Sequence, residues 1–323
     1  SLEKAHTALS DAQATAELFL CMRQKMFQLP KGLLERLLSL SDGLLYESYL
    51  VIEEVYQKQS LLVEHDLVEV QGLFLRKEKS ALSPRKLSKD FQTNIALLDL
   101  EDRAPQASFS QKVQDFLQNE KIAFVQAQTG IGKTYGYLLP ALAQENEKGI
   151  LLSVPTKILQ NQVMQEEVRR LEEVFHLSIH NLKGPQNYLK LDAFHHALEE
   201  EESNRLYTRF KMQLLVWLTE TETGDLDEIG QLYRYQQFLP NLVHDGNLPK
   251  ASLFWLEDFW RRGQEKARSC KLLVTNHAYL VTRLEDDPSL LEGRFLILDE
   301  AQKILLTLEN LSRKSYLLTD LLE

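Results

Sequence analysis

Two short segments, far apart in the chain, carry the residue types best suited to chemistry. Residues 127–134 read Ala-Gln-Thr-Gly-Ile-Gly-Lys-Thr, and residues 295–302 read Phe-Leu-Ile-Leu-Asp-Glu-Ala-Gln. A glycine-rich turn that ends in Lys-Thr brings several backbone N–H groups close to phosphate oxygens at once. Two acids that follow an apolar run suit a magnesium ion and an attacking water. Together the segments predict a site for a nucleoside triphosphate.

The glycine-rich segment divides its expected tasks among a few residues. Gly130 and Gly132 supply the turn. Lys133 is expected to reach the β- and γ-phosphates, and the Thr134 hydroxyl is expected to bind Mg²⁺. The full nucleotide-binding set predicted from this segment is Ala127, Gln128, Thr129, Gly130, Ile131, Gly132, Lys133 and Thr134.

The two acids divide the metal and water chemistry. Asp299 is expected to hold Mg²⁺ through its water shell, and Glu300 to deprotonate the water that attacks the γ-phosphate. With Lys133 they form the predicted catalytic set of this site. Taken alone, an Asp-Glu pair is more often a solvated helix start, because acids suit the positive end of a helix. The glycine-rich segment makes that alternative much weaker.

Both segments need a sheet to position them. Residues 122–125 are an apolar run that predicts a buried strand before the glycine-rich turn, and a helix is predicted after it over residues 135–142. The further predicted strands are residues 149–155, 271–274 and 294–298, and the further predicted helices are residues 112–119 and 159–175. This alternation is typical of an α/β domain with a parallel sheet, in which acids at strand ends face a ligand crevice.

The remaining sequence is mainly helical. The patterns predict a helix over residues 6–26, Leu-rich helices over 32–56, a small hairpin or meander over 61–75, a linker over 80–89 and an acidic helical insertion at about 192–268. The predicted domains are therefore a first helix (1–29), a mostly helical connector with a small β segment (30–100) and an α/β domain with its insertion (101–323).

Composition limits the class of protein. Apolar and charged residues make up 44% and 26% of the 323 residues, as in ordinary globular proteins. No apolar run approaches the length of a membrane span, and no secretion signal is evident, so a cytoplasmic location without membrane contact is predicted. The net charge of −10 argues against nucleic acid wrapped over the whole surface. A local groove lined by amides and hydroxyls stays compatible with that charge.

The motifs together resemble the DinG branch of superfamily 2, bacterial relatives of the XPD helicases, over about residues 50–323. The matching positions are Arg103 and Gln106, Ala127 to Thr134, Pro155-Thr156-Lys157 with Leu159, Gln160 and Gln162, Lys183 to Tyr188, Thr223 to Glu228, Asn276-His277, and Asp299 to Gln302. The resemblance implies a RecA-like P-loop domain that uses ATP and Mg²⁺.

The resemblance also implies roles for residues outside the two chemical segments. Arg103 and Gln106 would read the adenine edge, and Gln302 would bond across the nucleotide site, where the family usually has His. Contacts to single-stranded DNA, as in a tailed duplex, would come from Pro155, Thr156, Lys157, Gln160, Asn276 and His277. The sequence does not choose between DNA and RNA.

Many such relatives bind an iron–sulfur cluster through four cysteines near this insertion, the first directly after the Asn-Tyr segment. Leu189 and Lys190 stand at that place here, and the chain has two cysteines, Cys21 and Cys270. Because a cubane cluster needs four thiolates, we predict no cluster. The chain then resembles the cluster-free subgroup.

Residues 6–12, His-Thr-Ala-Leu-Ser-Asp-Ala, resemble the last motif of proofreading-type exonucleases. That resemblance implies that His6 is a general base and Asp11 a metal ligand of a 3'-5' exonuclease. The other exonuclease acids would lie before Ser1, and a second RecA-like domain would follow Glu323. The chain is therefore expected to be a piece of a larger protein, with little activity of its own.

Two functions are compatible with these patterns. The first is the motor domain of an ATP-dependent DNA helicase, joined to a 3'-5' exonuclease and acting in DNA repair or replication. The alternative is an ATP-regulated 3'-5' exonuclease that unwinds nothing. A third and weaker possibility is a nucleotide-binding module that serves only as an assembly switch.

Overall fold

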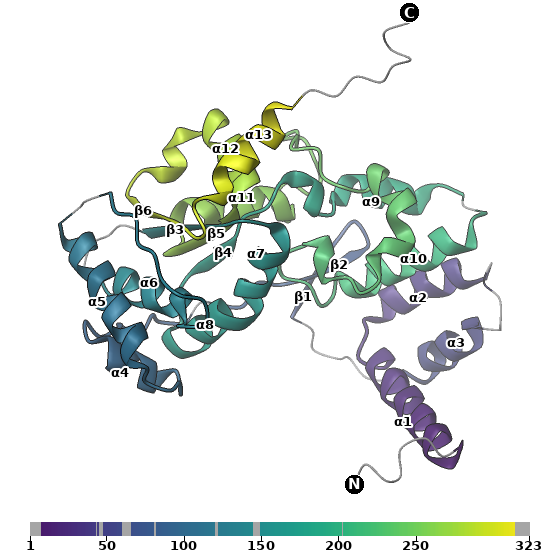
Figure 1. Ribbon diagram of the computed structural model, residues 1–323. Helices are drawn as coiled ribbons and strands as arrows, with labels where there is room; N and C mark the ends of the chain where they lie inside the picture. Colours follow the sequence, from purple (N-terminus) through teal and green to yellow (C-terminus); the bar gives the residue numbers. More distant parts are fainter. Residues whose placement is uncertain are drawn as a thin grey trace, which may run out of the picture. The chain divides into compact units, whose positions relative to one another are not determined.

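A computed structural model describes residues 8–42, 44, 48–59, 66–80, 82–119, 122–144, 149–201 and 203–313. The chain divides into two compact units. Figure 1 shows the chain coloured by residue number. The first, here called the helical unit, comprises residues 1–79 and 185–262, and the α/β unit comprises residues 80–184 and 263–323. None of the described helices is long and apolar enough to cross a bilayer.

The helical unit contains helices and one hairpin. Its helices are α1 (Ala8–Met26), α2 (Lys31–Ser41), α3 (Ser48–Lys58), α9 (Leu191–Glu199), α10 (Arg205–Trp217), the short 3-10 turns Pro185–Asn187, Leu226–Glu228 and Leu232–Asn241, and the first turn of α11 (Phe259–Ser269). Strand β1 (Leu67–Val70) pairs antiparallel with β2 (Leu73–Arg76). Gln71 and Gly72 have φ of 51° and 73°, as a tight hairpin turn requires. The predicted hairpin is confirmed in its described part.

One hydrophobic core joins the N-terminal helices to the insertion. Leu33 of α2 and Phe210 of α10 both belong to it and are 0% exposed. The backbone N–H of Arg76 donates to the carbonyl oxygen of Leu218 at 3.0 Å, which ties the hairpin to the end of α10. The compact units therefore differ from the predicted division, which assigned the insertion to the α/β domain. Periodicity marks the apolar face of each helix, but it does not say which faces meet.

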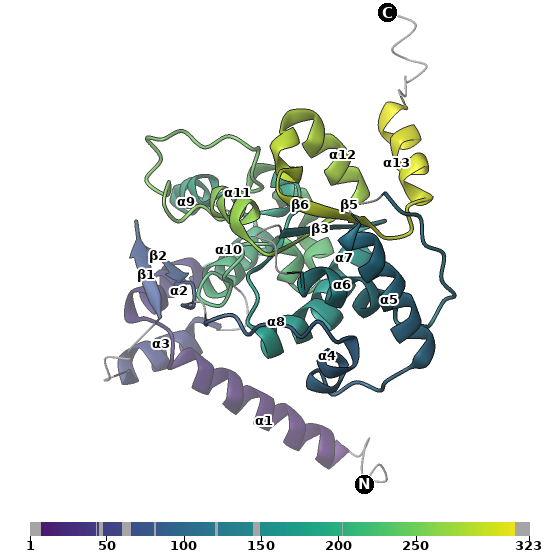
Figure 2. The ribbon, with the colours of Figure 1, turned by 90° about the vertical axis from the view of Figure 1, so that its left-hand side faces the viewer.

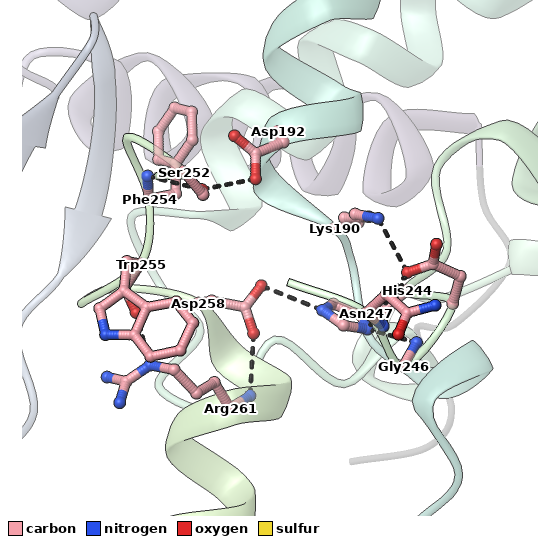
Figure 3. Close-up of polar contacts among 11 residues, drawn as sticks. Lys190, Asp192, His244, Gly246, Asn247, Ser252, Phe254, Trp255, Asp258 and Arg261 are labelled. Atoms are coloured by element: carbon pink, nitrogen blue, oxygen red, sulfur yellow. Dashed lines mark hydrogen bonds and ion pairs between the residues drawn. The ribbon is translucent and has the colours of Figure 1, made fainter. Parts of the chain in front are cut away.

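A buried polar pair lies where α11 begins (Figure 3). His244 and Asp258 are 1% and 0% exposed, and Nε2 of His244 lies 3.4 Å from Oδ2 of Asp258. Nδ1 of His244 accepts from the backbone N–H of Gly246 at 2.8 Å, so Nε2 carries the proton that faces the carboxylate. Asp258 Oδ1 accepts from the N–H of Arg261 at 2.8 Å and so caps α11. The pair links the loop that contains His244 to the start of α11.

The α/β unit is built on a parallel four-stranded sheet, as predicted. Its strands are β3 (Gly149–Val154), β4 (Ile179–Asn181), β5 (Leu272–Asn276) and β6 (Arg294–Leu298), in the order β4-β5-β3-β6. Its helices are α4 (Phe91–Leu97), α5 (Ala104–Gln118), α6 (Lys133–Leu142), α7 (Lys157–Val163), α8 (Arg169–Phe175), the rest of α11, α12 (His277–Asp286), the 3-10 turn Pro288–Leu291 and α13 (Lys303–Ser312), with a π-helical turn at Met164–Val168.

Strand β3 is buried along its whole length because helices cover both faces of the sheet. Ile150 and Leu152 pack in the core that α6 completes, whereas Leu151 packs in a second core with Leu280 of α12. Alternate side chains of a strand point to opposite faces, so α6 and α12 lie on opposite faces, as Figures 1 and 2 show. A strand buried on both faces reads as a continuous apolar run, which is why the sequence predicted it.

The strand predicted before the glycine-rich turn is wrong in this structure. Residues 122–128 form no strand, and Ile122 and Phe124 are 94% and 90% exposed. An apolar run becomes a strand only where a neighbouring strand accepts its backbone hydrogen bonds. Within the described ranges, the outer strand β6 pairs with β3 alone. The apolar composition of residues 122–125 does not reveal whether a neighbouring strand is available to pair with them.

Lowering the pH is expected to destabilise the α/β unit through protonation of His180 in β4. Burial, with Lys266 nearby, lowers the pKa of His180 from 6.5 to about 4. Between those values the unfolded chain binds a proton that the folded chain does not, so stability falls as pH falls through this window. The loss reaches about 3 kcal/mol below the window.

The variant His180→Gln isolates this effect. Urea unfolding followed by circular dichroism at about pH 7 and about pH 4 would measure both proteins. The wild-type protein should lose about 3 kcal/mol more than the variant between the two conditions. Equal losses would mean that His180 is protonated as easily in the folded protein as in the unfolded chain.

Candidate nucleotide site

Two glycines with left-handed backbone shape the turn before α6. The φ angle is +83° at Gly130 and +80° at Gly132, and α6 begins at the next residue, Lys133. The first N–H groups of a helix have no partner within it, so those of α6 are available to an anion. A Cβ on Gly132 would lie 2.2 Å from Nε2 of Gln106. Both the backbone and the space therefore favour glycine at this position.

Gln106 serves the turn itself. It is 5% exposed, and its Nε2 donates to the carbonyl oxygen of Gly132 at 2.7 Å. That amide nitrogen is bound to the loop, and the role of Gln106 at an adenine edge stays a prediction. Arg103, the N-cap residue of α5, is exposed and pairs with Glu101 at 3.2 Å. Its role at the adenine edge stays a prediction.

Replacing Gly132 with Ala is expected to weaken ATP binding by about tenfold or more, because strain at such a backbone costs about 1–3 kcal/mol. The variant Gly230→Ala is the matched control, since nothing lies within 4 Å of a Cβ there and its φ is not left-handed. Titration of both variants with ATP by calorimetry measures the effect. Equal affinities would show that the turn tolerates a side chain.

The acid pair follows β6 in a strained backbone. The N–H of Asp299 donates to the carbonyl oxygen of Ser153 at 2.9 Å, and the N–H of Glu300 donates to Oδ1 of Asp299 at 3.1 Å. Glu300 has a φ of +48°, which is sparsely populated for such a side chain. Lys303 holds its carboxylate at 2.6 Å. Strain of this kind concentrates at functional sites.

The Lys133 ammonium of the glycine-rich segment acts electrostatically on both acids. Burial raises the pKa of Asp299 above its usual range, and the nearby Lys133 ammonium opposes that rise. The hydrogen bond from Lys303 lowers the pKa of Glu300, and Lys133 lowers it further. The three predicted catalytic residues of the triphosphate site are therefore brought together in the α/β unit.

Sequence reasoning missed a third carboxylate at this site, that of Glu167. It lies in the π-helical turn, where it accepts a hydrogen bond from Thr134 and faces the charge of Asp299. Its Oε2 is buried without a hydrogen-bond partner, and burial raises its pKa. A π turn turns one side chain out of the usual helical register, which the 3.6-residue pattern over 159–175 could not reveal.

The residues present fit a magnesium triphosphate. Half-buried carboxylates at Asp299 and Glu167 lie near one another, and the Lys133 ammonium acts on Asp299 and Glu300. Such an arrangement favours a further cation, and the Thr134 hydroxyl offers the usual additional oxygen ligand. A helix start with free N–H groups offers the complementary site for phosphates.

Comparison with known proteins agrees with this geometry. Residues 106–221 match the model of the DEAD/DEAH box helicase family. The chain is 30% identical over 327 residues to 3'-5' exonuclease DinG of Bacillus subtilis (strain 168), across 93% of this chain and 34% of that protein. The chain carries a DEAD/DEAH box helicase domain and is homologous to DinG proteins.

Other DinG homologues agree. A protein named 3'-5' exonuclease DinG from Staphylococcus saprophyticus is 29% identical over 319 residues, across 94% of this chain and 34% of its own length. One from Staphylococcus aureus (strain USA300) is 28% identical over 295 residues, across 87% and 32%. The chain spans about a third of the length of these relatives. The helicase family implies ATP use, usually with Mg²⁺, and nucleic acid binding.

Exposure divides the nucleic-acid residues expected of this helicase domain into two groups. Thr156 and Lys157 are exposed at the start of α7, where Thr156 caps the helix by accepting from the N–H of Leu159 at 3.2 Å. Pro155, just before them, is buried. Gln160 is 0% exposed, and its Nε2 donates to Asn181 Oδ1 at 2.6 Å. Gln160 therefore has an internal hydrogen-bond partner, and its contact with nucleic acid stays a prediction.

Asn276 and His277 also serve the protein interior. Nδ2 of Asn276 donates to Oε1 of Gln160 at 2.8 Å, while its Oδ1 caps α12 by accepting from the N–H of Tyr279 at 3.0 Å. His277 is 0% exposed and lies between Ser153 and Asp299. Their polar atoms have these protein partners in the structure, and their contacts with nucleic acid stay predictions.

Exposure varies among the remaining residues predicted for the nucleotide site. Gln302 is exposed at the start of α13, directly after the acid pair. Gln128 and Thr129 of the glycine-rich segment are exposed, while Ala127 and Ile131 are partly buried.

The exonuclease prediction rests on His6 and Asp11. His6 lies outside the described residues. Asp11 is exposed on α1, a helix with no buried residue. Within the described ranges there is no group of three or more His, Cys, Asp or Glu side chains that could hold a metal ion. The metal-ligand role of Asp11 stays a prediction.

Proposed function

We propose that the chain is the ATP-binding motor domain of a DinG-like DNA helicase that acts in DNA repair or replication. One observation carries the proposal: Lys133 acts on both Asp299 and Glu300, so the loop that suits phosphates and the acids that suit metal and water form one site. Homology to DinG proteins and the match to the helicase family support it.

Each residue has a defined task in ATP hydrolysis. The α6 start and Lys133 would hold the phosphates, and Thr134 and Asp299 would hold Mg²⁺, which neutralises charge that develops on the γ-phosphate. Glu300 would orient the attacking water and accept its proton. Lys303 keeps the Glu300 carboxylate ionised by lowering its pKa, as a general base requires. Arg103 and Gln302 are proposed to flank the nucleotide.

The proposed nucleic-acid partner is single-stranded DNA, as in the tail of a tailed duplex. Thr156 and Lys157 offer an exposed hydroxyl and ammonium next to the C-terminal end of β3. A few such groups suit a backbone that is held locally, in keeping with the net charge of −10. The proposed location is the cytoplasm, with a second RecA-like domain and an exonuclease domain as partners.

We further propose that the domain works without an iron–sulfur cluster. The chain has two cysteines, of which Cys21 is exposed and Cys270 is buried. Burial raises the pKa of the Cys270 thiol, which disfavours the thiolate that a cluster needs.

The second candidate is an ATP-regulated 3'-5' exonuclease that unwinds nothing. The names of the relatives favour it, since each is called a 3'-5' exonuclease. In that case nucleotide binding would control cleavage at a site to which His6 and Asp11 belong.

One experiment separates the two candidates. The natural full-length protein is incubated with an end-labelled tailed duplex, with and without ATP and Mg²⁺, alongside Lys133→Ala, His6→Ala and the exposed-residue control Lys112→Ala. An intact displaced strand that requires ATP and disappears only in Lys133→Ala supports the helicase. A ladder of shortened strands that disappears in His6→Ala, with no displaced strand, overturns it in favour of the exonuclease.

A further inference from the structure

His277 holds one defined tautomer between two strands. Its Nε2 lies 3.0 Å from the carbonyl oxygen of Asp299, and its Nδ1 lies 2.7 Å from Oγ of Ser153. A carbonyl oxygen can only accept, so Nε2 carries the proton and donates it to Asp299. Nδ1 then accepts from the Ser153 hydroxyl. The ring is 0% exposed, in keeping with this neutral form.

The hydrogen bond from His277 to Asp299 fixes the peptide unit between Asp299 and Glu300. The orientation of this peptide unit sets the direction of the Glu300 backbone. The carbonyl oxygen of Asp299 and the N–H of Glu300 belong to the same planar group. His277 holds the oxygen, and Oδ1 of Asp299 accepts from the N–H at 3.1 Å. Because Glu300 has a φ of +48°, this peptide would rotate toward a more common backbone if either contact were lost.

The neighbouring residue connects this arrangement to α7. Nδ2 of Asn276 donates to Oε1 of Gln160 at 2.8 Å, and Nε2 of Gln160 donates to Asn181 Oδ1 at 2.6 Å and to the carbonyl oxygen of Leu182 at 3.0 Å. Gln160 is therefore fixed at both ends of its amide. It lies one helical turn from Thr156, the exposed cap of α7.

We propose that Gln160, Asn276 and His277 form a relay that couples nucleic acid held at Thr156 and Lys157 to the position of Asp299 and Glu300. A nucleic-acid strand bound at the start of α7 would change the position of Gln160 or restrict its motion. Asn276 then passes that change to the start of α12, where His277 holds the Asp299 carbonyl. The relay rests on the proposed function, because it makes ATP hydrolysis depend on nucleic acid. His277 acts in it as a positioning residue.

The test removes one link and keeps the local fold. Asn276→Asp and Asn276→Ser both retain an oxygen that caps α12, but neither presents the amide donor to Gln160. Thr282→Ala, an exposed position on α12, is the matched control. Phosphate release by the natural full-length protein is measured with and without single-stranded DNA, together with kcat and KM for ATP and the thermal midpoint.

The expected result is that DNA stimulates the wild-type protein and Thr282→Ala equally, while both Asn276 variants lose at least two thirds of that stimulation at an unchanged KM. His277→Gln should lower kcat about tenfold or more, again at an unchanged KM. Stimulation that survives in both folded Asn276 variants overturns the relay alone. Hydrolysis by the wild-type protein that DNA does not stimulate overturns the proposed motor function as well.

Discussion

Changing Glu300 to Gln is expected to lower ATP turnover by about 10²- to 10⁴-fold and to leave ATP affinity nearly unchanged. Gln has the size of Glu but cannot accept the proton of the attacking water. The lost ion pair with Lys303 matters less, because both side chains are partly exposed. Phosphate release at saturating ATP and single-stranded DNA, and calorimetric ATP binding, measure the two effects separately.

The matched control for Glu300→Gln is Glu292→Gln, which makes the same change at an exposed position of the α/β unit. It should hydrolyse ATP at the wild-type rate. If Glu300→Gln retained more than about a tenth of wild-type turnover, another group would have to act as the base. Glu167 would be the first to examine, since it faces the charge of Asp299 and bonds to Thr134.

The second large effect is expected in the helical unit, at the buried pair of Figure 3. Asp258→Ala removes the carboxylate that faces Nε2 of the buried His244 at 3.4 Å, and it removes the cap of α11. The expected cost is about 2–4 kcal/mol of unfolding free energy, from the lost buried polar contact and the lost cap. Asp258→Ser keeps a capping oxygen and should cost about 1 kcal/mol less.

Tryptophan fluorescence during urea unfolding reports this unit selectively. The chain has three tryptophans, and Trp217, Trp255 and Trp260 all lie between residues 185 and 262 of the helical unit. The control Asp66→Ala changes an exposed acid in the same unit and should shift stability by less than about 0.5 kcal/mol. A cost for Asp258→Ala as small as that would mean that the buried pair contributes nothing to the fold.

The sequence predicted what local patterns determine. The glycine-rich turn and the acid pair are short, and their chemistry depends on adjacent residues such as Lys133 with Thr134. Strand β3 was predictable because burial on both faces makes it apolar throughout. The parallel sheet followed from alternation of such strands with helices.

Long-range partners were beyond the sequence. Gln160 and His277 are polar residues near strand ends, where a ligand contact and an internal hydrogen bond give the same pattern. Only the fold brings Asn181 to Gln160 at 2.6 Å and Ser153 to His277 at 2.7 Å. The strand expected at residues 122–125 failed for the same reason, since pairing depends on a neighbour. The orientation of Glu167 depends on a π turn that periodicity does not encode.

The shared core of the helical unit has a consequence for biosynthesis. Leu33 of α2 and Leu73 of the hairpin pack in one core with Phe210 and Phe254, which are translated much later. Ribosomes add about 5–20 residues per second, so the early apolar surfaces wait for several seconds or more for their partners. During that interval, the α/β residues that separate the two halves must emerge first. We expect the nascent chain to need protection by chaperones until residue 262 has left the ribosome.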